Sequence, residues 1–320
     1  MGTYKFDLIF AGHFAMDHKI IHGKDIHGLG GTVTFGSLAA ATFNPKFRIG
    51  IISTVGKDFK PEYRQFIETH RIDTQGIYVS GDVSTHYTLN YSESGRTLYL
   101  SGRAQDLTIT QVPVAYFNTK AVMLGPIAGE ISNEFIFEFL EHANGNIIIG
   151  MDAQGFIRNF ANDGRVLEYS TSKKCENIFT LIDELNENLV FKASDTEATA
   201  ITGKTSPMEA AEVLCRNKAI IVITRGPKGS LIKIQGHDII KIPAFKPRDV
   251  VDETGAGDAY MAGFLAQYIA GGKDVANLEK CGLVGSATAS FLIEEPGPRG
   301  FGTQEQIFSR IDQKRVLPQD

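Results

Sequence analysis

The residues best suited to chemistry lie in one glycine-rich stretch, 251–260, which runs into an apolar helix predicted to begin at about Ala256. Gly255 and Gly257 flank the small Ala256, so backbone N–H groups can converge on an oxyanion with no side chain in the way. The positive end of the helix dipole favours an anion there, and it also favours the carboxylate of Asp258 in the first turn. The stretch predicts an anion-binding turn beside a base, although a plain tight turn with an aspartate in the first helical turn has the same pattern.

The sequence of this turn has a known counterpart. Residues 252–258, Asp-Glu-Thr-Gly-Ala-Gly-Asp, resemble the second signature of the PfkB (ribokinase-like) carbohydrate kinases at seven consecutive positions. The last aspartate of that signature is the family's catalytic base, which implies that Asp258 is the base for the acceptor hydroxyl. The resemblance also implies that Gly255, Ala256 and Gly257 donate hydrogen bonds around the transferred phosphoryl group.

A second candidate lies near the N-terminus, after a continuous apolar run from Leu8 to Phe14. Such a run is expected of a strand buried on both faces of a parallel sheet. Asp17 lies just past its end, and ligands of open α/β sheets collect at the carboxyl ends of strands. Asp17 is either a turn aspartate or an acceptor for a substrate's hydroxyl hydrogens. The resemblance implies the second, because the family has a sugar-binding aspartate at this place.

The pair Gly30-Gly31 opens a predicted helix of small residues and lets the backbone approach a ligand closely. It resembles the first PfkB signature, which implies a contact with the substrate. Phe35 stands where sugar kinases of this family place an asparagine, and its ring cannot make the hydrogen bonds of an amide. The sequence Thr-Phe-Gly-Ser at 34–37 is instead similar to the inositol kinase-type branch.

Asp152, Gln154 and Arg158 follow an apolar strand predicted over 146–151. An acid, an amide and a guanidinium at the C-terminal end of a strand can bind hydroxyl or phosphate groups. A capped turn with a surface arginine explains the same pattern without a ligand. The segment again looks like the inositol kinase-type branch, which implies that these side chains contact the substrate.

A metal-organising residue is implied by the stretch from Ser194 to Ala198, which resembles the family's Asn-x-x-Glu motif. The glutamate of that motif organises Mg²⁺ through water, and Glu197 occupies its position. Ser194 replaces the asparagine and offers fewer hydrogen bonds. Mg²⁺ is therefore an expected cofactor, with Glu197 as the residue that organises it.

The nucleotide is expected beside a buried strand that runs into a polar, glycine-bearing turn at 224–229. That turn looks like the family's Thr-x-Gly-x-x-Gly nucleotide loop, which implies ATP contacts at Thr224 and Gly226, while a simple hairpin turn is the alternative. In this family a helix of small residues, here 276–293, forms a shelf for the adenine. Ser286 stands there in place of the usual asparagine.

Short apolar strands are predicted over 121–125, 146–151 and 188–191, with an amphipathic helix over 132–143 between the first two, and this alternation indicates a parallel sheet. Between 86 and 100 the apolar period changes to two, which predicts a hairpin with a turn at Ser94-Gly95. Because the motifs occur in the family's order along nearly the whole chain, the expected fold is a ribokinase-like α/β fold, a three-layer α/β/α sandwich with a small β-sheet lid. We expect a single domain over 1–320, with lid segments near 15–30 and 84–104 that close on the substrate or pack on a second subunit. A plain surface hairpin is the alternative.

Composition limits the other function classes. The chain has 320 residues, of which 42% are hydrophobic and 22% charged, enough for a large core. Its net charge of −5 offers no basic field for nucleic acid or an anionic membrane, so neither is an expected partner. The 3 cysteines are widely spaced without a Cys-x-x-Cys pair, which argues against a disulfide framework and a zinc site. A cytoplasmic location is expected.

The combined expectation is a kinase that transfers the γ-phosphoryl group of ATP to a hydroxyl of a small polyol or sugar. Phe35 with its neighbours and the segment 152–158 resemble inositol kinases, so myo-inositol is the expected acceptor. Two alternatives stay open. One is a nucleoside kinase of the same family, in which Phe35 stacks on a base. The other is a protein of this fold that binds nucleotide or polyol without catalysis. The lid is also a candidate surface for a homodimer.

Overall fold

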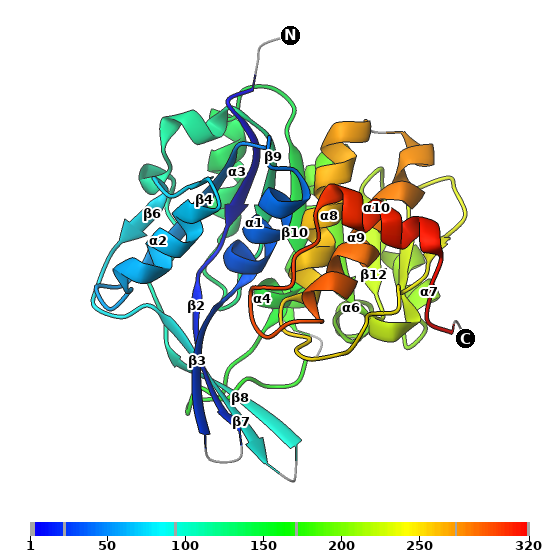
Figure 1. The fold of residues 1–320 in the computed structure, drawn as a ribbon. Coiled ribbons are helices and arrows are strands. Elements are labelled where there is room, and N and C mark those ends of the chain that lie inside the picture. The colour runs from blue at the N-terminus through cyan, green and yellow to red at the C-terminus, as the bar shows by residue number, and fades with distance from the viewer. Residues whose placement is uncertain (1–3, 22–23, 93–94, 170–171, 273, 319–320) are drawn as a thin grey trace.

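The computed structural model describes the chain except for residues 1–3, 22–23, 93–94, 170–171, 273 and 319–320. A large sheet forms the centre, helices cover it, and a smaller sheet projects from one end (Figure 1). The arrangement is the expected ribokinase-like α/β fold.

Ten strands form the main sheet within the described residues. They are β1 (Phe6–Ala11), β4 (Ile49–Val55), β5 (Ile72–Asp73), β6 (Ile77–Val79), β9 (Thr119–Leu124), β10 (Ile148–Asp152), β11 (Leu189–Ser194), β12 (Ile220–Thr224), β13 (Ser230–Lys233) and β14 (Ile240–Ile242). Their order is β14-β13-β12-β11-β10-β9-β1-β4-β5, and β6 also pairs with β4. The sheet is parallel from β12 to β5, as expected, but β13 and β14 are antiparallel. The edge is antiparallel because the short turn after β12 returns the chain as a hairpin, which was the open alternative for residues 224–229.

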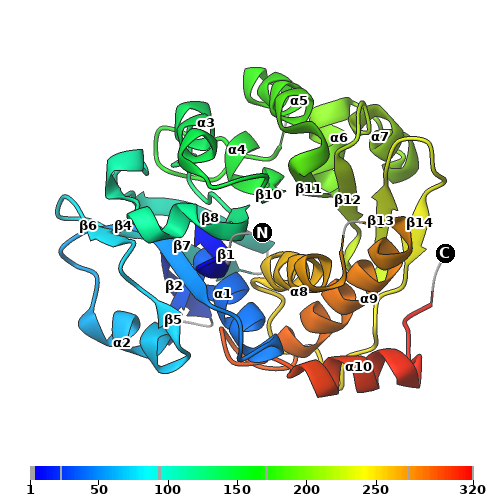
Figure 2. The ribbon, with the colours of Figure 1, turned by 90° about the horizontal axis from the view of Figure 1, so that it is seen from above.

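Helices pack on both faces of the main sheet, so the fold has three layers (Figure 2). One face carries α1 (Thr32–Phe43), α2 (Pro61–Thr69), α8 (Ala256–Gly271), α9 (Val275–Leu292) and α10 (Gln304–Gln313). The other carries α3 (Asn133–His142), α4 (Ala153–Ile157), α5 (Lys173–Leu185), α6 (Asp195–Thr202) and α7 (Pro207–Leu214). Short 3-10 turns lie at Ile109–Gln111, Val114–Phe117, Asn186–Asn188 and Gly226–Lys228. Hydrophobic clusters fill both interfaces between sheet and helices. No described helix is long and apolar enough to cross a membrane.

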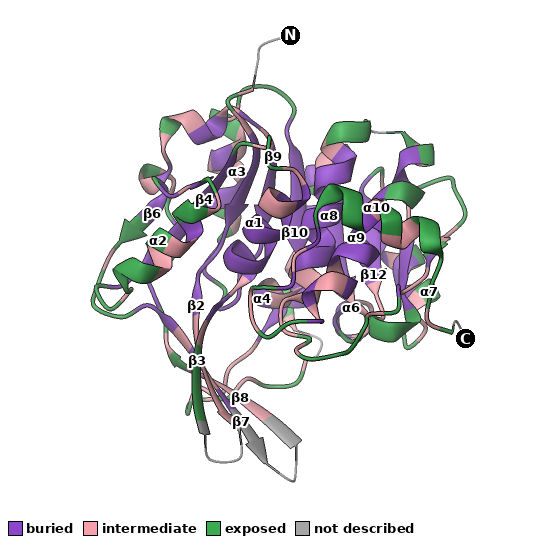
Figure 3. Cartoon of the chain, in the orientation of Figure 1, coloured by how far each residue is buried: buried purple, intermediate pink, exposed green. Residues whose placement is uncertain are grey.

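Two helices near the middle of one face, α1 and α8, decide where the candidate site lies. Both are buried along most of their length (Figure 3). Small residues permit this, since a side chain at Gly36 would come within 2.6 Å of the Phe10 ring on β1. Close packing brings the N-terminal ends of both helices to the carboxyl edge of the main sheet, where ligands of such sheets bind.

The smaller sheet has four strands, β2 (Ala15–Ile21), β3 (Lys24–Gly30), β7 (Thr85–Ser92) and β8 (Gly95–Gly102). Their order is β3-β2-β7-β8, and we call this sheet the lid. The expected lid segments and the hairpin are present, although residues 93–94 of its turn lie outside the described residues. Tyr87 and Leu89 are buried on the apolar face of the hairpin, as expected.

Asp17 lies on a strand of the lid, within the segment near 15–30 that was expected there, and the first strand ends earlier than its apolar run suggests. β1 ends at Ala11, and the chain turns at Gly12, where any side chain would collide with the Gly125 carbonyl. The next strand begins at Ala15. An apolar run that continues to Phe14 hides this break, because it spans the end of one strand and the start of the next.

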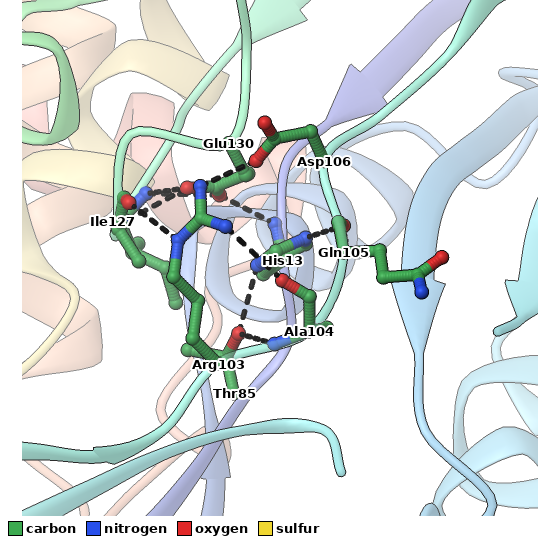
Figure 4. Close-up of polar contacts among 9 residues, drawn as sticks. His13, Thr85, Arg103, Ala104, Gln105, Asp106, Ile127 and Glu130 are labelled. Carbon is green, nitrogen blue, oxygen red and sulfur yellow. Dashed lines mark hydrogen bonds and ion pairs between the residues drawn. The ribbon is translucent and has the colours of Figure 1, made fainter. Parts of the chain in front are cut away.

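A polar cluster joins the lid to the main sheet (Figure 4). His13 is fully buried, and its ring contacts Thr85 Oγ1 at 2.8 Å and the Gln105 carbonyl at 2.9 Å. Glu130 is also fully buried and accepts hydrogen bonds from the backbone N–H groups of His13 and Ile127. Since Thr85 begins β7 and His13 precedes β2, the cluster fixes the base of the lid.

Candidate active site

Two cavities meet at the N-terminal end of α8. The lid cavity, of about 470 Å³, lies beneath the lid, and the α9 cavity, of about 400 Å³, lies between the turn after β12 and helix α9. Thr224, Glu253, Ala256 and Gly257 line both. A molecule in one cavity can therefore reach a molecule in the other across the first turn of α8, which is the geometry that group transfer requires.

The glycine-rich turn has the conformation that its sequence predicts. Gly255 has φ +82° and is the N-cap of α8. Any side chain there would overlap the ring of Phe35, which is 2% exposed. A side chain at Gly257 would come within 2.8 Å of Lys192 Nζ. Glycine at both positions thus keeps the backbone N–H groups open to the cavities.

Asp258 lies in the first turn of α8 and lines the lid cavity. Its Oδ1 accepts a hydrogen bond from Thr32 Oγ1 at 2.7 Å, which holds the carboxylate against α1. Burial and the negative charge of Asp152 raise the pKa of Asp258 to about 6, against the opposing effects of Lys192 and Thr32. The carboxylate is still mostly ionised at neutral pH, and a pKa near the working pH suits a general base.

Lys192 is a central residue of the lid cavity that the sequence interpretation missed. Its Nζ donates to Asp152 Oδ2 at 2.7 Å, and both side chains are buried. Burial opposes the charged form, but the negative charges of Asp152 and Glu197 outweigh it and raise the pKa of Lys192. One feature of the sequence could have identified Lys192. It is a lysine within the mainly apolar strand 189–194, where burying an unpaired charge would cost free energy.

Arg158 is not the surface arginine of the alternative interpretation. It is 7% exposed, and its Nη1 donates to the Ile127 carbonyl at 2.8 Å and to Tyr87 Oη at 3.2 Å. Burial raises the pKa of Tyr87 to about 12, so the phenol stays neutral. The Nε of Arg158 has no hydrogen-bond partner among the described residues. An unsatisfied buried donor costs about 1–3 kcal/mol, so an acceptor atom of a ligand would be stabilised here.

The two glycines at the start of α1 have different roles. Gly31 has φ +88°, is the N-cap of α1 and lines the lid cavity. Gly30 does not line either cavity, but a side chain there would collide with the Asp17 carboxylate. Gly30 therefore makes room for Asp17, which lines the lid cavity from β2.

Glu197 and Ser194 form a capping box at the start of α6. Glu197 Oε2 accepts from the Ser194 N–H at 2.7 Å, and Ser194 Oγ accepts from the Glu197 N–H at 3.2 Å. Glu197 also hydrogen-bonds Tyr169, and all three residues line the lid cavity. The serine that stands in place of the family's asparagine thus has a structural role as the N-cap of α6, a position that both residue types suit.

The α9 cavity has mainly apolar walls, which include Pro227, Phe245, Ile293 and Leu317. The Ser286 hydroxyl lines it but donates to the Pro243 carbonyl at 2.6 Å, so its hydrogen is already used. The turn at Gly226–Lys228 is the hairpin of the alternative interpretation and also a wall of the cavity. Phe245 and Leu317 were not expected, since neither lies in a recognisable motif.

The structure places the predicted site residues around two adjoining cavities. The lid cavity is lined by Asp17, Gly31, Asp152, Gln154, Arg158, Glu197, Gly255, Ala256, Gly257 and Asp258, and the α9 cavity by Thr224, Gly226 and Ser286. Residues from distant parts of the chain thus converge on one place.

Comparison with known proteins agrees with this arrangement. Residues 38–304 match the model of the pfkB family carbohydrate kinases. The chain belongs to this family. It is therefore a phosphotransferase with an alcohol group as acceptor, and it acts on a sugar or nucleoside.

Two relatives of this pfkB family kinase cover most of its length. The nucleoside kinase of Methanocaldococcus jannaschii is 29% identical over 88% of this chain and 87% of its own. The cytidine kinase of Thermococcus kodakarensis is 27% identical over 91% of this chain and 97% of its own. A pyrophosphate-dependent kinase of the ribokinase family, solved with a pyrophosphate analogue and myo-inositol, has a TM-score of 0.72 at 21% identity, and covers 97% of this chain and 100% of its own. At 21% identity, the similarity to this ribokinase-family structure shows a shared fold.

Proposed function

We propose that this pfkB family kinase transfers the γ-phosphoryl group of ATP to a hydroxyl of a nucleoside bound in the lid cavity. The observation that carries the proposal is the division of that cavity into two parts. Tyr87, Leu89, Leu98 and Ile127 form an apolar wall, while Asp258 lies at the junction with the α9 cavity. A nucleoside has a matching division into a flat base and a hydroxylated ring.

The relatives favour the same acceptor class. The proteins of M. jannaschii and T. kodakarensis that match about nine-tenths of this chain are named as nucleoside and cytidine kinases. The sequence left the nucleoside open as an alternative acceptor. Phe35 does not decide between the two acceptors, because its ring packs under Gly255 and is 2% exposed, which leaves little of it to stack on a base or to cover a polyol.

Asp258 acts as the general base in the proposed reaction. Its carboxylate takes the proton of the acceptor hydroxyl, whose oxygen then attacks the γ-phosphorus of ATP. The bond between that phosphorus and the β,γ-bridging oxygen breaks, and ADP leaves. Thr32 holds the carboxylate in place through the hydrogen bond at 2.7 Å. The N–H groups of the 255–257 turn stabilise charge on the transferring group, which is the main demand of a loose transition state.

The α9 cavity is the proposed ATP site. Its apolar walls suit a base, and Thr224 and Gly226 lie where the cavity approaches the first turn of α8. Ser286 contributes packing and an oxygen acceptor there, because its hydrogen is bonded to the Pro243 carbonyl. The triphosphate would then extend toward the 255–257 turn.

The residues present fit a loosely held Mg²⁺. Among the described residues, no group of three or more His, Cys, Asp or Glu side chains could hold a metal alone. Mg²⁺ usually needs only one or two carboxylates, with substrate phosphates and water as its other ligands. Glu197 is the carboxylate that we propose to organise the ion through water, and when bound the ion would neutralise phosphate charge.

A panel of acceptors tests the proposal. With ATP and Mg²⁺ at one pH, the acceptors compared are cytidine, adenosine, guanosine, uridine, ribose, fructose and myo-inositol. We expect kcat/KM to be highest for one of the nucleosides. A site that hydrogen-bonds particular groups can reject analogues lacking them by about 10⁴-fold. A tenfold higher kcat/KM for myo-inositol would overturn the nucleoside proposal in favour of the acceptor expected from sequence. Acceptor-independent ATP hydrolysis is the background control.

The second candidate, myo-inositol, keeps one observation in its favour. Asp17, Asp152 and Gln154 place oxygen and amide groups around the lid cavity, and these suit a ring with a hydroxyl on every carbon. Asp152 is already paired with Lys192, which leaves fewer of these groups free for such a rim. The panel decides between the two acceptors directly.

A further inference from the structure

A lysine of the lid reaches the segment that leads into the glycine-rich turn, where Thr254 lines the lid cavity. Lys19 lies on β2, and its Nζ donates to Asp252 Oδ2 at 2.6 Å and to Thr254 Oγ1 at 3.3 Å. Asp252 and Thr254 immediately precede Gly255. The ion pair therefore joins two parts of the chain that are 233 residues apart.

Asp252 is the point where three segments meet. Its Oδ1 accepts from the Thr254 N–H at 3.0 Å and from Thr254 Oγ1 at 2.6 Å. Its Oδ2 accepts from Lys19 and from the Gly297 N–H at 3.3 Å. Burial alone would raise the pKa of Asp252, but hydrogen bonds from Lys19 and Thr254 outweigh it and hold that pKa below its usual value. The carboxylate thus carries its charge at neutral pH.

Enclosure separates this pair from an ordinary surface ion pair. The side chains of Lys19 and Asp252 are 14% and 17% exposed. Those of Lys57 and Asp82, at the similar distance of 2.8 Å, are 75% and 81% exposed. Exposed pairs contribute little because water and salt screen them. The Lys19–Asp252 pair is shielded from water and salt, so breaking it should change the conformational freedom of both segments that it joins.

We propose that Lys19 is a positioning residue that couples the lid to the 254–257 turn, so that a lid seated on the acceptor holds the N–H groups of the turn in place for phosphoryl transfer. This inference rests on the proposed function only in that the turn contacts the transferring group. A displacement of about 1 Å in such a group can cost about 10²-fold in rate, so a distant lysine can matter without touching either substrate. The lid sheet thereby acts on the chemistry as well as on acceptor binding.

Steady-state kinetics of Lys19→Met test the proposal, with Lys57→Met as the matched control. We expect Lys19→Met to lower kcat by about 10- to 100-fold and to raise the KM of the acceptor, while the Kd for ATP without acceptor stays unchanged. Lys57→Met should behave as wild type. Lys19→Arg keeps the charge and should restore most of the rate. In Lys19→Met/Asp252→Asn the losses should not add, because each single change already breaks the pair.

Hydrogen–deuterium exchange gives a readout that needs no substrate. In Lys19→Met the amides of Thr254 and Gly297, as well as those of β2, should exchange faster than in wild type or Lys57→Met. Faster exchange confined to β2 would show that the lid and the turn are not coupled and would overturn the proposal. So would a kcat within about threefold of wild type for a folded Lys19→Met.

The two readouts also separate this proposal from the identity of the acceptor. The kinetics use whichever acceptor the panel selects, and the exchange is measured on the free enzyme. Lys19→Gln repeats the test with a polar, neutral side chain if Lys19→Met is too unstable to purify. Coupled exchange with no turnover of any acceptor would leave the role of the lysine supported and reject the proposed function instead.

Discussion

The lid cavity and the α9 cavity share the first turn of α8 but are built on opposite plans. In the lid cavity, buried carboxylates have fixed hydrogen-bond donors: Lys192 Nζ donates to Asp152 at 2.7 Å, and Thr32 Oγ1 donates to Asp258 at 2.7 Å. In the α9 cavity most walls are apolar, and the Ser286 hydroxyl is bonded to backbone. One cavity offers polar groups in fixed positions, and the other offers mainly shape.

With the acceptor and ATP bound as proposed, this difference predicts which substrate is selected more strictly. Fixed polar groups reject a ligand that leaves them unpaired, by about 10⁴-fold or more, whereas apolar walls discriminate by only about 10- to 200-fold. We therefore expect strict selection of the acceptor and tolerant selection of the phosphoryl donor.

The largest expected effect comes from Asp258→Asn, which removes the proposed base without changing the size of the side chain. Turnover should fall by about 10²- to 10⁴-fold, the usual contribution of a general base. Affinity for ATP, measured by calorimetry, should stay near that of wild type, because ATP is assigned to the other cavity. Turnover within threefold of wild type, with chemistry rate-limiting, would remove Asp258 from this role.

Lys192→Met tests whether the charges of the lid cavity depend on one another. Asp152 would be left buried without its partner, and breaking a buried pair in this way typically costs about 3–5 kcal/mol of unfolding free energy. The pKa of Asp258 should rise further, because Lys192 now opposes its shift. Urea denaturation measures the first effect. Lys192→Met/Asp152→Asn is the matched control, and if it is no more stable than the single variant, the pair is not the cause.

The acid limb of the pH profile is the next effect in size. Since the pKa of Asp258 is raised to about 6, kcat/KM should fall about tenfold per pH unit below that value, as the base becomes protonated. Thr32→Val removes a hydrogen bond that stabilises the ionised carboxylate, so the limb should move to higher pH. Thr32→Ser keeps the hydroxyl and serves as control. A limb that does not move in Thr32→Val would argue that another group titrates.

The fold could be predicted from sequence where periodicity and motif order agree. The buried strands, the hairpin at 85–102 and the helix after Gly255 all have local signals in turn residues and apolar period. The end of β1 at Ala11 had no such signal, because the apolar run continues through the break at Gly12. The hairpin after β12 could only be held open as an alternative, since a parallel and an antiparallel strand look alike when both are apolar.

The candidate site was predictable for residues in contiguous motifs and not for residues that matter through their partners. Asp258 and Glu197 lie in motifs of fixed spacing. Lys192 gains its position from Asp152, which is 40 residues away, and Lys19 from Asp252. Such pairs depend on how strands and lid are placed in space, and a single sequence contains no record of that placement.

A comparison of phosphoryl donors tests the expected weak donor selectivity of the α9 cavity. With the best acceptor held saturating, kcat/KM for ATP, GTP and CTP should differ by no more than about 10- to 200-fold, because the α9 cavity has mainly apolar walls. The acceptor panel should span a wider range under the same conditions. A donor ratio larger than the acceptor ratio would reverse the assignment of selectivity to the two cavities.

The smallest expected effect is that of Glu197→Gln on the Mg²⁺ requirement. Glutamine can replace glutamate in a capping box, so the start of α6 and the stability of the protein should change little. The negative charge near the ion would be lost, and the Mg²⁺ concentration for half-maximal rate should rise by about tenfold, as for other groups that act on a metal through its ligands.

Ser194→Ala is the matched control, because it removes the Ser194 hydroxyl that accepts from the Glu197 N–H, and keeps the charge. That variant should lose about 0.5–2 kcal/mol of stability with an unchanged magnesium titration. If Glu197→Gln leaves the titration unchanged too, Glu197 has only a structural role in the lid cavity, and the metal must be organised by phosphate and water alone.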